Sequence, residues 1–297
     1  MIAIPFGRAQ IFYIRSLGFA MRIQLDAAQV IDLIDDDDNE LRHLLSGHQC
    51  AISSSVVLDL FKKTDRPSRN YYGAFRELSV SWGVDAGVLC NTEIKTGIEL
   101  LSAGVDSRSN LHACFPFRAS ILDAISVRLG VPVPAEFATK GFGDLMCDPF
   151  AKIVMKIVAE QYYKGRMEYW RNSLTRSTQE RGPDFLVALR VRVGELYEPN
   201  LSEIIEGVDI ETLQRLFPAF MLAWALRQVC FDDRRTKWKD NDIVDLFHIL
   251  LSPYCNYTFC DGNMYRRLER TRQYVPWRTH YVANADVKPF LRQLRKG

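Results

Sequence analysis

The sequence has little that would place it in a membrane or join it by disulfides. No run reaches the roughly 18 apolar residues that a membrane-spanning helix requires. The seven cysteines are scattered, odd in number and without a C-x-x-C pair, a pattern that favours reduced thiols over a disulfide framework or a structural zinc site. We therefore expect a cytoplasmic protein with no membrane partner.

Two further absences narrow the chemistry. The chain contains no G-x-x-x-x-G-K-[ST] loop, and "KGFGD" (140–144) has too few glycines for a phosphate-cradling fingerprint. The formal net charge of +2 indicates no particular partner. Residues 262–297, however, hold nine Lys and Arg against two acids, which predicts either a phosphate-binding surface or a solvated basic helix.

The first part of the chain alternates strand-like and helical patterns. Short apolar runs at 21–25 and 50–53 predict two buried strands, and each is followed by helical spacing, at 27–34 and 56–63. One of the serines 53–55 is placed to cap the second of these helices. The four aspartates 35–38 are expected to end one helix and begin the next, over 39–47.

The same alternation returns near the end of the chain. The expected order is a helix, a strand, a helix, a strand and a basic helix, over residues 240–251, 255–260, 262–271, 279–284 and 287–296. Between the two ends, segments of mostly helical spacing, "FRELSVSW" (75–82) among them, are separated by Gly and Pro breakers. We expect an α/β core from 21–65 and 240–297, a mainly helical insertion over 66–239, and a peripheral extension over 1–20.

Four aspartates occupy comparable places in this predicted core. Asp26 and Asp261 each follow a strand directly. Asp59 lies in the second turn of the helix after the second strand, and Asp242 opens the helix before the third. Open parallel sheets bind ligands outside the carboxyl ends of their strands, so Asp26 and Asp261 are expected to meet there. Each acid alone is more often a helix cap or a solvated surface group.

The order of these acids resembles the PIN domain family of metal-dependent nucleases. The matching segments are "RIQLD", "AISSSVVLD" and "NDIVDLFHILL…YTFCD". The resemblance covers about residues 21–65 and 240–285. It implies a PIN-like, Rossmann-like parallel sheet with flanking helices, in which the large, mainly helical insertion is an addition.

The resemblance also implies an active site. Asp26, Asp59, Asp242 and Asp261 stand where the family's catalytic metal ligands stand, and Asp245 looks like the additional acid of some members. Carboxylates with water suit Mg²⁺ or Mn²⁺, and such ions promote phosphodiester hydrolysis. The expected substrate is single-stranded RNA rather than DNA. Four side chains that follow the last acid are expected to contact it: Asn263, Arg266, Arg267 and Arg270.

Two other interpretations stay open. The fold could serve as a catalytically weak binding or regulatory module, since Ala28 and Asp59 depart from the family's usual asparagine and glutamate. Alternatively, the chain could be a nuclease toxin controlled by a partner protein that contacts the helical insertion.

Overall fold

The computed structural model describes most of the chain, in eight segments: residues 21–35, 38–62, 71–104, 116–118, 141–196, 203–233, 238–275 and 279–296. The predicted extension, residues 1–20, lies outside them, as does Cys114. The other six cysteines are all free, as expected for reduced thiols. Within these segments, no helix combines the length and the apolar character needed to cross a bilayer.

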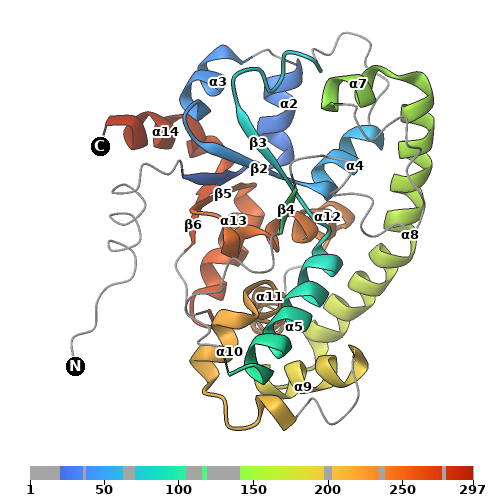
Figure 1. Ribbon diagram of the computed structural model, residues 1–297, viewed down its shortest axis with the longest axis vertical. Coiled ribbons are helices and arrows are strands. Elements are labelled where there is room, and N and C mark those ends of the chain that lie inside the picture. Colours follow the sequence, from blue (N-terminus) through green and yellow to red (C-terminus); the bar gives the residue numbers. More distant parts are fainter. Residues whose placement is uncertain are drawn as a thin grey trace.

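A six-stranded sheet organises the α/β part (Figure 1). Its strands are β1 (Arg22–Gln24), β2 (Gln49–Ser53), β3 (Ser79–Gly83), β4 (Phe117–Arg118), β5 (Tyr257–Cys260) and β6 (His280–Ala283). The spatial order is β4-β3-β2-β1-β5-β6. Every neighbouring pair is parallel except β3 with β4. The predicted parallel α/β sheet with strands from both ends of the chain is therefore confirmed.

The position of β3 corrects one prediction. Residues 75–82 were expected to be helical, but residues 79–83 pair along their whole length with β2. The physical reason is tertiary: Trp82 is buried and stacks on Phe142, with ring centroids 5.7 Å apart. Eight residues are also too few for helical and strand periodicity to be told apart. Two strands of the sheet, β3 and β4, therefore come from residues 66–239, the segment expected to be a mainly helical insertion.

Helices surround the sheet and form a second body below it in Figure 1. The helices from the two chain ends are α2 (Ala27–Asp35), α3 (Asn39–Leu45), α4 (Ser54–Lys62), α12 (Asp240–Ile249), α13 (Gly262–Thr271) and α14 (Val287–Lys296). Those from residues 66–239 are α5 (Ala86–Ser102), α7 (Phe142–Cys147), α8 (Pro149–Gln179), α9 (Phe185–Leu196), α10 (Ile210–Leu216) and α11 (Pro218–Asp232). Short 3-10 turns stand at η4 (Ser252–Tyr254) and η5 (Asn284–Asp286).

Short polar side chains begin these helices, as the sequence predicts. Ser53 Oγ accepts from Val56 N at 3.3 Å and so caps α4. The aspartate run behaves as expected, since α2 ends at Asp35 and Asp38 Oδ1 accepts from Leu41 N at 2.9 Å at the start of α3. These bonds satisfy backbone N–H groups that have no partner within the helix. Helix starts are thus set locally.

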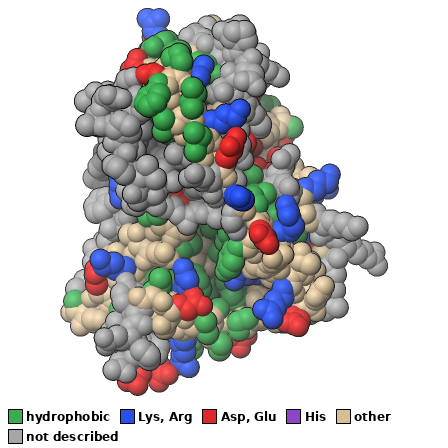
Figure 2. Space-filling model, turned by 90° about the vertical axis from the view of Figure 1, so that its right-hand side faces the viewer, with side chains coloured by type: hydrophobic (Ala, Val, Ile, Leu, Met, Phe, Trp, Pro, Cys, Tyr) green, Lys and Arg blue, Asp and Glu red, His purple; other side chains and the backbone are tan. Residues whose placement is uncertain are grey.

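Helix α8 connects the sheet region to the helical body. It runs along one side of the molecule (Figure 1) and contacts α4, α7, α11 and α12. Hydrophobic side chains lie at the surface on this side, among Lys and Arg (Figure 2). Phe150, Ile153 and Ile157 of α8 are 55%, 60% and 49% exposed, whereas Ala151, Met155 and Ala159 are buried. Helix α8 therefore has apolar side chains on its exposed side as well as on its buried side.

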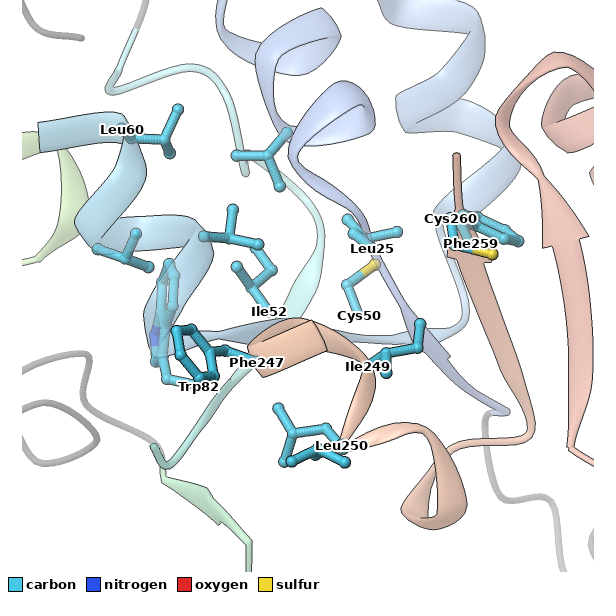
Figure 3. Packing of buried hydrophobic residues seen from close by; sticks show 14 of the residues in the cluster. Leu25, Cys50, Ile52, Leu60, Trp82, Phe247, Ile249, Leu250, Phe259 and Cys260 are labelled. Atoms are coloured by element: carbon cyan, nitrogen blue, oxygen red, sulfur yellow. The ribbon is translucent and has the colours of Figure 1, made fainter. Parts of the chain in front are cut away.

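Two hydrophobic clusters underlie this division. The larger cluster joins the strands to α12 and includes Leu25, Cys50, Ile52, Phe247 and Ile249 (Figure 3). The smaller one is built from α5, α9, α10 and α11, with Ile94, Leu189, Leu213 and Met221 among its members. The helical stretch thus has a core of its own.

Glu93 of α5 links the helical body to the sheet. Its side chain is fully buried. Its Oε1 accepts from Ala219 N at 2.7 Å, and its Oε2 accepts from Phe220 N at 3.0 Å, at the start of α11. The Tyr254 hydroxyl, just before β5, also donates to Oε1. Burial raises the pKa of Glu93 to about 7, although these hydrogen bonds oppose the shift.

We expect Glu93 to make stability depend on pH. The folded protein holds this proton more tightly than the unfolded chain, so the stabilisation is complete below the ordinary pKa of 4.5 and is lost as pH rises through about 7. The loss should be on the order of 3 kcal/mol. Denaturant unfolding of the wild type and of Glu93→Gln, at about pH 5 and about pH 8, measures it. An equal pH dependence in both proteins would contradict this assignment.

We also expect a larger side chain to destabilise the protein where α5 packs against the start of α11. A Cβ at Gly97 would lie 2.3 Å from Cε1 of the buried Phe217. Gly97→Ala should therefore destabilise the protein by about 1–3 kcal/mol. Gly194→Ala in α9 is the matched control: nothing lies within 4 Å of its added Cβ, so helix propensity should stabilise that variant by up to about 1 kcal/mol. Thermal or denaturant unfolding compares the two.

Candidate metal centre

The strand order reverses at β1, which defines where a ligand can bind. From β1 the chain proceeds to β2 and β3 on one side, whereas β5 and β6 lie on the other. In open parallel sheets, the crevice at the carboxyl ends beside such a reversal is the usual ligand site. Asp26 follows β1 and Asp261 follows β5, and these strands are neighbours. Both predicted acids therefore stand at the reversal.

Asp26 is held in place by α2 and by the segment that follows β6. Its Oδ1 accepts from Ala27 N at 2.7 Å, at the start of α2. Its Oδ2 accepts from Asn284 Nδ2 at 2.8 Å, just after β6. Gln29 Nε2 in turn donates to Asn284 Oδ1 at 3.1 Å. The side chain of Asp26 is 13% exposed, so its carboxylate is oriented by these bonds and has little contact with solvent.

Helix α12 contributes Asp245 and His248. Because they are three residues apart, they share one face of the helix. The other side of the helix carries Leu246 and Phe247 into the main core, where Figure 3 shows Phe247. His248 is only 4% exposed, and its Nδ1 lies 3.8 Å from Asp26 Oδ1. Packing of α12 thus brings its polar face to the end of β1.

The acids predicted from the sequence act on one another here. The pKa of Asp245 is raised to about 8, chiefly by burial, and then by the charges of Asp26, Asp261, Asp242 and Asp59, in that order. Crowded carboxylates disfavour each other's ionisation. The carboxyl of Asp245 therefore holds its proton to higher pH than usual, and a bound cation would displace that proton.

Not every acid in this group is equally open to a ligand. Asp261 Oδ1 accepts from Met264 N at 2.6 Å and caps α13. Asp59 is half-buried in α4. Asp242 is buried, and its Oδ2 accepts both from Lys239 N at 2.8 Å and from Arg267 Nη2 at 3.2 Å. Arg267 therefore neutralises Asp242, while the structure gives no such arginine to Asp26 or Asp245 among the described residues.

This pairing gives Arg267 a structural role that the sequence did not predict. Its guanidinium is buried, bonds to Asp242 and lies 3.9 Å from the centre of the Trp238 ring. It joins α13 to α12, and its side chain is largely removed from the surface. The sequence could not show this, because the partner lies 25 residues away in another helix.

The other three residues expected to contact a substrate remain near the surface. Arg266 and Asn263 are exposed, and Arg266 Nη2 donates to Asn263 Oδ1 at 2.7 Å. Arg270 is exposed and pairs with Asp233. Their role on a substrate stays a prediction.

Three groups could together hold a metal ion. One donor atom each from Asp26, Asp245 and His248 lie within 4.8 Å of one another. The sequence prediction included the two aspartates and missed His248. The D-x-x-H spacing on α12 was the available signal, since it places both side chains on one helix face. Asn284 was also missed, although it is the last residue of a predicted strand that ends at the same edge.

Comparisons with known proteins add no relative: a scan against protein-family models, a search of curated proteins and a search of solved structures each found no match.

We expect Arg267 to matter for stability through Asp242. Arg267→Met should destabilise the protein by about 3–5 kcal/mol, because it leaves a buried carboxylate unpaired. Adding Asp242→Asn should recover much of this loss, since an amide still accepts from Lys239 N. Denaturant unfolding of both variants measures the difference. A loss below about 1 kcal/mol for Arg267→Met would mean that the ion pair is not needed.

Proposed function

We propose that this protein is a divalent-cation-dependent nuclease with a PIN-like fold, using Mg²⁺ or Mn²⁺ to hydrolyse phosphodiester bonds of single-stranded RNA. The observation that carries the proposal is the convergence of Asp26, Asp245 and His248, with donor atoms within 4.8 Å of one another. They lie at the reversal point of a parallel sheet, the usual place for a ligand. The order of acids that resembles the PIN family supports the same reading.

The charge of the site favours this chemistry over binding of an organic anion. The carboxylates of Asp26, Asp261, Asp242 and Asp59 all act on Asp245, and such a group repels a phosphate until a cation is present. When bound, a divalent ion supplies positive charge that activates water and stabilises the departing oxygen.

The chain's own residues would then orient the reactants. Asp26, fixed by Ala27 N and Asn284, holds its carboxylate toward the site. In hydrolysis, the water oxygen bonds to phosphorus, the phosphorus–oxygen bond to the leaving group breaks, and the leaving oxygen receives a proton. The exposed Arg266 and Arg270 lie on α13, the helix that Asp261 caps, and are the candidates to contact neighbouring phosphates.

The test is cleavage of a fluorescent single-stranded RNA with Mn²⁺ by the wild type, Asp26→Asn and Asp245→Asn. Each variant should lose roughly 100-fold or more of activity, the usual effect of losing one electrostatic stabiliser. Asp209→Asn is the matched control, because Asp209 caps α10 and accepts from Thr212 N at 2.8 Å. It should retain full activity. Equal cleavage by all four proteins, or none by the wild type with any divalent ion, would reject the proposal.

A further inference from the structure

The donor set at this site is mixed rather than purely acidic. Two carboxylate oxygens and one imidazole nitrogen meet, from Asp26, Asp245 and His248. Among the five histidines of the sequence, His248 alone belongs to a group of this kind in the described segments. Imidazole is a ligand of first-row transition metals, whereas Mg²⁺ selects oxygen ligands and keeps several waters.

The spacing of these donors is close to that of a formed site. Ligands about 2.0–2.2 Å from an ion can stand at most about 4.4 Å apart. The donor atoms lie within 4.8 Å of one another, and His248 Nδ1 is 3.8 Å from Asp26 Oδ1. Small side-chain rotations would therefore suffice, without movement of α12 or β1.

His248 is also anchored as a ligand residue needs to be. Its carbonyl oxygen accepts from Gln24 Nε2 of β1, and Gln24 Oε1 accepts from Thr258 Oγ1 of β5 at 3.2 Å. All three residues are buried. The backbone at His248 is thus tied to both strands that end at the site, which fixes the origin of the imidazole.

We propose that His248 is a direct ligand of the cation and that the site therefore selects a transition-metal ion, Zn²⁺ above Mn²⁺ and both above Mg²⁺. This inference rests on the cation site of the proposed function and deepens it. Three protein ligands of this kind with an open position are typical of catalytic rather than structural zinc sites. The order of affinities follows from the general order for divalent ions at nitrogen and oxygen ligands.

Calorimetric titration of the full chain with each of the three metal ions, as chlorides, tests the order. Zn²⁺ should bind more tightly than Mn²⁺, and Mn²⁺ more tightly than Mg²⁺. His248→Gln should weaken Zn²⁺ binding by at least roughly 100-fold, because loss of a mere outer-shell partner costs roughly 10–100-fold. His280→Gln is the control, an exposed histidine on β6, and should leave the affinity unchanged. Mg²⁺ binding as tightly as Zn²⁺ would overturn the proposal.

A second measurement does not depend on how the variant folds. In wild-type protein labelled with ¹⁵N histidine, Zn²⁺ should shift the ring-nitrogen signals of one imidazole at a stoichiometry of one ion. Zn²⁺ bound with all imidazole signals unchanged would overturn the role of His248 and would point to cysteine or carboxylate ligands instead.

The two proposals fail in different ways. Zn²⁺ bound through His248, without RNA cleavage in any metal ion, would reject the nuclease and support the metal site. RNA cleavage with Mg²⁺ that His248→Gln leaves undiminished would support the nuclease and overturn the inference about His248.

Discussion

Burial of one helix beneath the sheet is the constraint from which the site follows. Helix α12 must place Leu246 and Phe247 in the core, and this packing turns Asp245 and His248 toward Asp26. Such burial stabilises the fold by about 1.5–3 kcal/mol for each large side chain, and it brings the carboxylates close together. Burial of Asp245 first, and then repulsion by the neighbouring carboxylates, raise its pKa to about 8. A cation would remove that repulsion without any change of fold.

The neighbouring acids have different partners. Asp242 is paired with an arginine and has a structural role, whereas Asp26 accepts from neutral donors. Asp242 is neutralised by Arg267, which lies against Trp238. It belongs to the framework that joins α12 to α13. Asp26 is oriented by an amide and a backbone N–H rather than by an arginine. Such neutral donors fix a carboxylate while leaving its charge available to a ligand.

The helical body is connected to the sheet by apolar and by polar contacts. Leu222 and Leu226 of α11 belong to the larger hydrophobic cluster, which also contains the strands. Glu93 binds the start of α11 and the hydroxyl of Tyr254, which stands just before β5. Helix α8 contacts both α4 beside the sheet and α11 below it. The smaller core of α5, α9, α10 and α11 is therefore held against the strands that carry the site. The helices of residues 66–239 thus pack against the part of the structure that contains the site.

The sequence by itself determined the local features: strands that are followed by Asp26 and Asp261, and helices that are capped by Ser53 and Asp38. Periodicity and capping depend on residues within one or two turns, so they can be read without coordinates. Tertiary structure decided the rest. Residues 79–83 form β3 because they pair with β2. Arg267 is buried because it forms an ion pair with Asp242 of another helix. His248 joined Asp26 because α12 packs on β1 and β5, a contact between residues more than 200 positions apart, which no local pattern encodes.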